Sequence, residues 1–316
     1  MKQITLIGLL LIGFYTKGYG GDLLTDIIRF ASIDKAKQLL TQEDDFTACW
    51  SQFDIDSRLQ KKNSTKDELL KHISSQVRGW APKEKAKILS MLKSIDKSIA
   101  KQGFNIDFPD EIYFVKTTAK EEGGAGGYTR ANYVVLKEGI LSLSKGDLKK
   151  LIVHELFHVL SRNNPNLRKA LYKIIGFEII KEIEYPENLK NYRITNPDAT
   201  QTDSYITLVY NGQQVDCMMI LYASQDYDGG DFFKYLNIGF LNLKGTENKE
   251  VDYVDGQAVI YTFKEVSNFY EQVGRNTGYI IHPEEILADN FTFAILKKKG
   301  LPNQEIVDEI KKKLRE

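Results

Sequence analysis

The sequence contains little cysteine, proline or histidine and has no excess charge of either sign. Its 316 residues include 2 Cys, 7 Pro and 4 His, and 43 Lys and Arg balance 43 Asp and Glu. A neutral chain creates no long-range field for a polyanion, which argues against nucleic acid as its main partner. Two cysteines are too few for a cysteine-rich zinc site. With 42% apolar residues, the chain is long enough to bury a sizeable globular core.

Long apolar runs are absent except near the start of the chain. Lys2 precedes an apolar run from Ile4 to Phe14, and small residues follow at 18–21. This order is typical of a secretory signal peptide, and the run is too short to span a bilayer. We therefore predict that residues 1–20 are removed and that the protein is extracytoplasmic, either periplasmic or secreted, with no stable membrane anchor. Cys49 and Cys217 form either one disulfide or two buried free thiols.

The spacing of apolar residues predicts an α+β protein with two regions. Helical spacing predicts a helical N-terminal region over 21–110. The second region, 111–316, begins with β-branched and aromatic runs at 112–115 and 133–136, separated by a glycine-rich loop at 123–127. Alternating runs with Asn-Gly and Asp-Gly turns predict an antiparallel β insertion at about 186–261. Helices are predicted at 147–162, 167–183, 264–273, 283–299 and 304–315.

Two of the four histidines flank a glutamate in His154-Glu155-Leu156-Phe157-His158, which has the form H-E-x-x-H. On a helix, the two imidazoles are about 40° apart, so both can reach one ion at the roughly 2.0 to 2.1 Å that zinc requires. Glu155 lies about 60° from His158, beside the ion, which is the position of a base that takes a proton from bound water. The alternative, two chance histidines on a core helix, requires a rare coincidence with this glutamate.

A catalytic zinc site needs a third protein ligand, and the sequence offers three candidates. Glu285 is the best, because Asp289 follows it by one helical turn in the pattern E-x-x-x-D. In this pattern the Glu binds the metal, and the Asp accepts the outer N–H of a ligating imidazole. Glu178 ranks lower because it lies in a predicted amphipathic helix. His282 is better placed to cap the acidic helix that follows it.

The two motifs together resemble the gluzincin branch of zinc metallopeptidases, which includes thermolysin. The resemblance implies a zincin-like fold, with the β insertion between the two motif helices. It also implies Zn²⁺ on His154, His158 and Glu285, with Glu155 as general base and later proton donor and Asp289 behind a ligating imidazole. The segments 127–130 and 281–285 are similar to an uncharacterised family of secreted bacterial zincin-like proteins.

Zincins commonly place the strand before the metal helix at a sheet edge, where it pairs with an extended peptide. The stretch Tyr128–Leu136 is in the corresponding place, and main-chain pairing there gives affinity without side-chain selectivity. Tyr128, Arg130 and Tyr279 are the candidates for the group that stabilises the oxyanion of the tetrahedral intermediate.

The sequence thus predicts a secreted zinc metallopeptidase that acts on a peptide or protein substrate. Its mechanism would be Glu155-assisted attack of zinc-bound water on the peptide bond. One alternative is hydrolysis of another amide or an ester at the same site, with the β insertion narrowing the cleft. The other is a binding protein that keeps the scaffold without turnover. The intact Glu155 argues against that second alternative.

Overall fold

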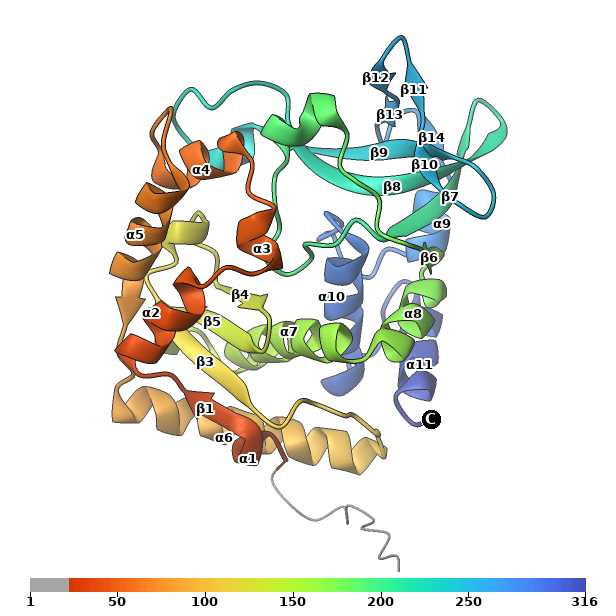
Figure 1. Ribbon diagram of the computed structural model, residues 1–316. Coiled ribbons are helices and arrows are strands. Elements are labelled where there is room, and N and C mark those ends of the chain that lie inside the picture. The colour runs from red at the N-terminus through yellow and green to blue at the C-terminus, as the bar shows by residue number, and fades with distance from the viewer. Residues whose placement is uncertain (1–22) are drawn as a thin grey trace, which may run out of the picture.

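Two large β-sheets and the helices that cover them organise the chain (Figure 1). The computed structural model describes residues 23–316, so the predicted signal peptide lies outside the described residues. Mixed helix and strand content confirms the α+β class. Among residues 23–316, no helix combines the length and apolar character that crossing a bilayer requires.

Helices and short strands alternate in the N-terminal region, which we predict above as helix throughout. Four of the helices begin at a Ser, Thr or Asp whose side chain accepts a backbone N–H of the first turn. The helices are α1 (Leu23–Ile27), α2 (Ile33–Thr41), α3 (Asp45–Ala48), α4 (Gln52–Leu59), α5 (Lys66–Gln76) and α6 (Pro82–Gln102). Strands β1 (Ile28–Phe30) and β2 (Val77–Arg78) belong to the first sheet instead.

The first sheet has the strand order β1-β3-β5-β4, and β2 pairs with the far end of β3. Its remaining strands are β3 (Ile112–Thr117), β4 (Gly127–Arg130) and β5 (Tyr133–Lys137). Strands β1, β3 and β5 are parallel, whereas β4 is antiparallel to β5 and forms one edge. The stretch Tyr128–Leu136 is therefore not a single edge strand. It forms a hairpin, of which only β4 lies at the edge.

Side chains of the first sheet pack on helices at both faces. Phe114 and Val134 belong to the core that includes α6 and α7 (Lys145–Asn163). Val115 follows Phe114 and Val135 follows Val134, so both valines point to the other face of the sheet. They belong to the core that includes α2 and α5. Burial of both faces explains why the central strands are nearly continuous apolar runs.

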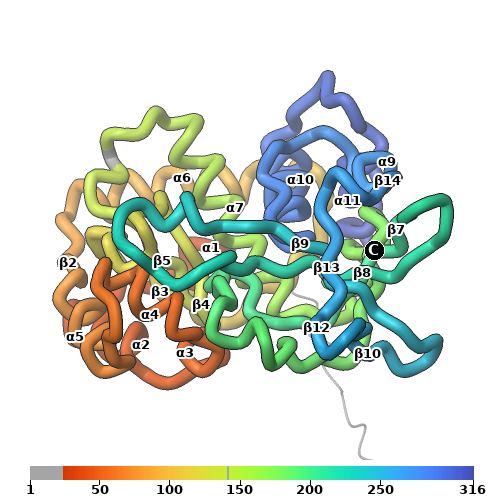
Figure 2. The backbone as a smooth tube through the Cα atoms, turned by 90° about the horizontal axis from the view of Figure 1, so that it is seen from above, coloured from red at the N-terminus to blue at the C-terminus, as the bar shows by residue number. Residues whose placement is uncertain are grey.

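Helix α7 and the fully buried helix α10 (Pro283–Ile295) cross near the middle of the molecule, where Phe157 and Phe291 have ring centroids 5.2 Å apart. The hydroxyl of Ser144 caps α7, and the Nδ1 atom of His282 caps α10. All 13 residues of α10 are buried. Seen from above, α2 to α5 lie on one side of α7, and α10 and α11 (Gln304–Lys313) lie on the other (Figure 2).

The predicted helix 167–183 is wrong beyond Ile174. Helix α8 (Pro165–Ile174) ends there because Gly176 adopts a φ of +80°, and the chain continues as strand β6 (Phe177–Ile179). Of the predicted helix 264–273, only α9 (Phe269–Val273) is helical, and strand β14 (Val266–Ser267) precedes it.

The second sheet is antiparallel throughout and lies above α10 in Figure 1. It extends from 177 to 267, beyond the predicted 186–261, because β6 and β14 both pair with β7. Its remaining strands are β7 (Ser204–Tyr210), β8 (Gln213–Ala223), β9 (Leu236–Lys244), β10 (Glu250–Val251) and β13 (Ile260–Tyr261). Strands β11 (Tyr253–Val254) and β12 (Gln257–Ala258) pair only with each other and form a separate hairpin. Cys217 on β8 and Cys49 after α3 are free thiols.

Short 3₁₀ helices connect several of these elements. They are η1 (Lys120–Glu122), η2 (Ile140–Ser142), η3 (Glu187–Tyr192) and η4 (Phe232–Lys234). The residues from 193 to 203, between η3 and β7, form no regular element. This segment descends between α3 and α10 before it returns to β7 (Figure 1).

Candidate metal centre

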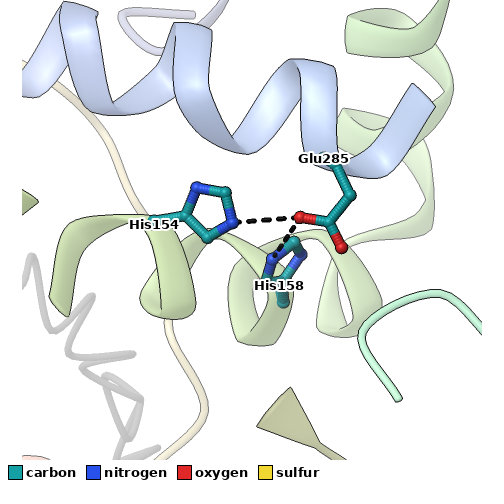
Figure 3. Close-up of side chains that lie close together, drawn as sticks. All are labelled: His154, His158 and Glu285. Atoms are coloured by element: carbon teal, nitrogen blue, oxygen red, sulfur yellow. Dashed lines mark hydrogen bonds and ion pairs between the residues drawn. The ribbon is translucent and has the colours of Figure 1, made fainter. Parts of the chain in front are cut away.

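Three side chains from two helices converge where α7 and α10 cross (Figure 3). His154 and His158 project from α7 one turn apart, and Glu285 faces both of them from the first turn of α10. The Oε2 atom of Glu285 lies 3.0 Å from Nε2 of His154 and 3.5 Å from Nε2 of His158. The ligating atoms of the three residues all lie within 4.8 Å of one another. The structure therefore brings together the three residues that we predict as metal ligands.

Each imidazole turns its other nitrogen toward a further carboxylate on α10. The Nδ1 atom of His154 lies 3.2 Å from Oδ1 of Asp289, and Nδ1 of His158 lies 3.5 Å from Oε1 of Glu284. A carboxylate behind an imidazole fixes which nitrogen carries the proton and leaves the other nitrogen free to bind a metal. Asp289 has the place predicted for it. Glu284, which is not among the predicted site residues, has the same relation to His158.

The outer carboxylates are themselves held in place. The hydroxyls of Tyr172 and Ser161 donate to Oε2 of Glu284 at 2.8 and 3.1 Å, and the hydroxyl of Thr277 donates to Asp289. A buried carboxylate is costly unless it is paired and hydrogen-bonded. These bonds explain how a fully buried helix carries three acidic side chains.

The histidines and the glutamate strongly perturb one another. Burial disfavours charge on Glu285, but the imidazoles of His158 and His154 outweigh burial and hold its pKa well below the ordinary value. Burial also opposes charge on His154, yet the carboxylates of Asp289 and Glu285 raise its pKa to about 9. Metal binding at this cluster would therefore have to displace a proton from His154.

The residues present fit a divalent metal ion. The Nε2 atom of His158, which faces Glu285, is completely buried without a hydrogen-bond partner, and this is costly for a polar atom unless a ligand satisfies it. Two imidazoles and one carboxylate are the donor set of catalytic zinc sites such as that of thermolysin. Within residues 23–316, neither free thiol belongs to a group of possible metal ligands.

Glu155 lies beside this cluster, buried between α7 and the edge strand β4. The hydroxyl of Thr129 donates to its Oε2 atom at 2.9 Å. Burial raises the pKa of Glu155, against the opposing effect of the two imidazoles. A raised pKa makes the Glu155 carboxylate a stronger base toward a proton of water, which suits general acid–base catalysis.

The other two candidates for the third ligand lie elsewhere. Glu178 is on β6, half-exposed, with its Oε1 atom 3.8 Å from Nζ of Lys173. His282 is buried with its Nδ1 atom committed to capping α10, where it accepts the N–H of Glu284 at 3.1 Å. Burial lowers the pKa of His282 to about 4, so its ring is neutral at physiological pH.

Two of the three oxyanion candidates point away from the cluster. The hydroxyl of Tyr128 donates to Oε1 of Glu121 at 3.0 Å, and the guanidinium of Arg130 binds Asp44, both on the opposite face of the sheet. Tyr279 remains near the site, since its ring centroid is 6.2 Å from that of His154 and the residue is 45% exposed.

The segment 193–203 supplies two site residues that we do not predict from the sequence. The side-chain amide of Asn196 donates to Oε1 of Glu285 at 2.7 Å. Asp198 lies over His158 and accepts the backbone N–H of Thr129 at 2.6 Å. The sequence carries only a turn signal, Asn-Pro-Asp, at this point, and no motif that links the turn to α7 or α10.

Comparison with known proteins gives no relative. No protein-family model matches the chain, and no curated protein or solved structure is significantly similar to it. Any functional conclusion therefore depends on the geometry described above.

Proposed function

We propose that the chain is a zinc-dependent peptidase with a zincin-like catalytic unit and that it cleaves peptide bonds in a peptide or protein substrate. The observation that carries this proposal is the meeting of His154, His158 and Glu285, although Glu285 is 131 residues from His154 in sequence. When bound there, zinc supplies Lewis-acid polarisation of a carbonyl and makes water more acidic. His154, His158 and Glu285 would hold it.

The residues around the cluster have separate tasks in this reaction. Asp289 and Glu284 keep the two imidazoles oriented with Nε2 toward the metal. Thr129 holds Oε2 of Glu155, so that Oε1 is free to take a proton from water and later return it to the leaving amine. The main chain of β4, at the sheet edge, would pair with an extended substrate.

The direct test is hydrolysis of a peptide library by the zinc-loaded chain, followed by mass spectrometry. We expect new peptide termini in the zinc-loaded sample, none after removal of the metal with a chelator, and recovery when zinc is returned. An amide or ester hydrolase of another kind would bind zinc but leave every peptide intact. A chain that binds no zinc would contradict the proposal outright.

A close contact at Gly127 gives a prediction about the position of Glu155. A Cβ atom at residue 127 would lie 2.9 Å from Oε1 of Glu155 and 3.1 Å from the backbone oxygen of Val135. Because the backbone of Val135 cannot move freely, the Gly127→Ala substitution should displace the Glu155 carboxylate. A misplacement of about 1 Å can cost about 10²-fold in rate, so we expect kcat to fall on that scale with zinc affinity unchanged.

The Gly126→Ala variant is the matched control for this measurement. A Cβ atom at 126 would meet only the Leu151 side chain, at an ordinary 3.8 Å. Steady-state kinetics and zinc titration of both variants should separate them. Equal activity in the two variants would show that Glu155 does not depend on this contact.

A further inference from the structure

The segment 193–203 closes the space above the metal cluster. Asn196 connects it to α10 through Glu285, and Asp198 connects it to β4 through the backbone N–H of Thr129. The turn between them is fixed locally, because the N–H of Asp198 donates to Oδ1 of Asn196 at 3.0 Å. The segment thus bridges helix α10 and strand β4, which would receive a substrate.

The carboxylate of Asp198 lies in the place that the reactants need. Its Oδ1 atom is 4.0 Å from Nε2 of His158, and the ligating atoms of Glu155, His158 and Asp198 lie within 4.8 Å of one another. These three residues do not form a second metal site, because the same Nε2 atom of His158 also faces Glu285 and one lone pair binds one ion. Asp198 is therefore close to both the proposed general base and one proposed metal ligand.

Asp198 also occupies the edge of β4. An extended peptide that adds to a sheet edge must accept the free N–H groups of the edge strand. The N–H of Thr129 is already bound by Asp198 at 2.6 Å. A substrate carbonyl and the Asp198 carboxylate would compete for this donor.

The chain on the N-terminal side of the turn is anchored on helix α4. Thr195 donates its N–H and its hydroxyl to buried Asp54 of α4. The guanidinium of Arg58, also on α4, donates to the backbone oxygen of Thr195 at 3.0 Å. The turn itself is held through the side chains of Asn196 and Asp198 and through the guanidinium of Arg162 on α7, which donates to the backbone oxygen of Asp198 at 3.2 Å. Movement of 196–199 alone would open the site and leave the anchor in place.

We propose that residues 196–199 form an autoinhibitory strap, in which the Asp198 carboxylate takes the place of substrate and must withdraw before an extended peptide can bind to β4. This inference rests on the proposed zinc-peptidase function.

The test measures access to the metal. The protein is loaded with Co²⁺, whose visible absorption reports ligand exchange, and titrated with acetohydroxamate. If the strap is closed most of the time, the apparent affinity of the wild type is reduced by the fraction of open molecules. We expect the Asp198→Ala variant to bind acetohydroxamate at least about tenfold more tightly than the wild type. Asp67→Ala, on the exposed surface of α5, is the matched control and should behave as the wild type.

A second variant guards against misfolding. Asp198→Asn removes the charge but keeps an oxygen that can accept the N–H of Thr129, so it should also bind the hydroxamate more tightly, by a smaller factor. If cobalt binds and both variants bind hydroxamate as the wild type does, or more weakly, the proposed strap is contradicted, whereas the proposed metal site is supported. If no form of the protein binds cobalt, the proposed function fails together with the strap.

Discussion

Replacing Glu155 by Gln should abolish peptide hydrolysis while zinc remains bound at one ion per chain. The carboxylate takes and returns a proton in the proposed reaction, and an amide can do neither. A positioned general base contributes about 10²- to 10⁴-fold, and here one residue serves in both proton transfers. We therefore expect kcat to fall by at least about 10³-fold.

The same substitution should not harm the fold. The amide has nearly the shape of the carboxylate, and its oxygen can still accept the hydroxyl of Thr129. Burial raises the pKa of Glu155, so a neutral side chain suits this position. The thermal midpoint should thus be no lower than that of the wild type. Glu187→Gln, at a side chain that is 85% exposed, is the control for handling and purity. Full activity of Glu155→Gln would remove the general base from the mechanism.

Replacing Glu285 by Gln should weaken zinc binding by at least about 10²-fold. Loss of a residue that merely supports a ligand typically costs about 10- to 100-fold in metal affinity, and loss of the ligand itself must cost no less. Glu285 also faces both imidazoles with one oxygen atom, at 3.0 and 3.5 Å. Its removal therefore disturbs all three proposed ligands.

Glu178→Gln is the matched control, because the sequence offers Glu178 as an alternative ligand. This carboxylate lies on β6, with Lys173 as its ionic partner. Competitive titration with a zinc-sensitive dye should show wild-type affinity for Glu178→Gln and greatly reduced affinity for Glu285→Gln. Unchanged affinity in Glu285→Gln, or a loss in Glu178→Gln, would show that the third ligand is assigned wrongly.

Local signals in the sequence were sufficient to predict the helices that carry the proposed ligands. The predicted helices 147–162 and 283–299 correspond to α7 (Lys145–Asn163) and α10 (Pro283–Ile295). The spacing of four residues then dictates that His154 and His158 share one face. The pairing of Glu285 with these histidines was predicted through the resemblance of two motifs, because no local signal connects residues so far apart.

Features that depend on contacts between distant segments could not be predicted in this way. Alternation in β4 shows that Thr129 points opposite to Tyr128 and Arg130, but the sequence does not show which side faces Glu155. The apolar spacing that predicts a helix from Leu167 also continues past Gly176, although the positive φ of this glycine ends the helix. Asp198 reaches the site through contacts of its segment with α4 and α7, which are both distant in sequence.

X-ray absorption at the zinc edge of the chain loaded with one equivalent of zinc tests the central claim most directly. We expect a first shell of nitrogen and oxygen only, with multiple scattering from two imidazoles and metal–nitrogen distances of about 2.0 to 2.1 Å. Sulfur in the first shell, scattering from fewer than two imidazoles, or zinc that is lost on gel filtration would contradict the proposal that His154, His158 and Glu285 bind one catalytic metal ion.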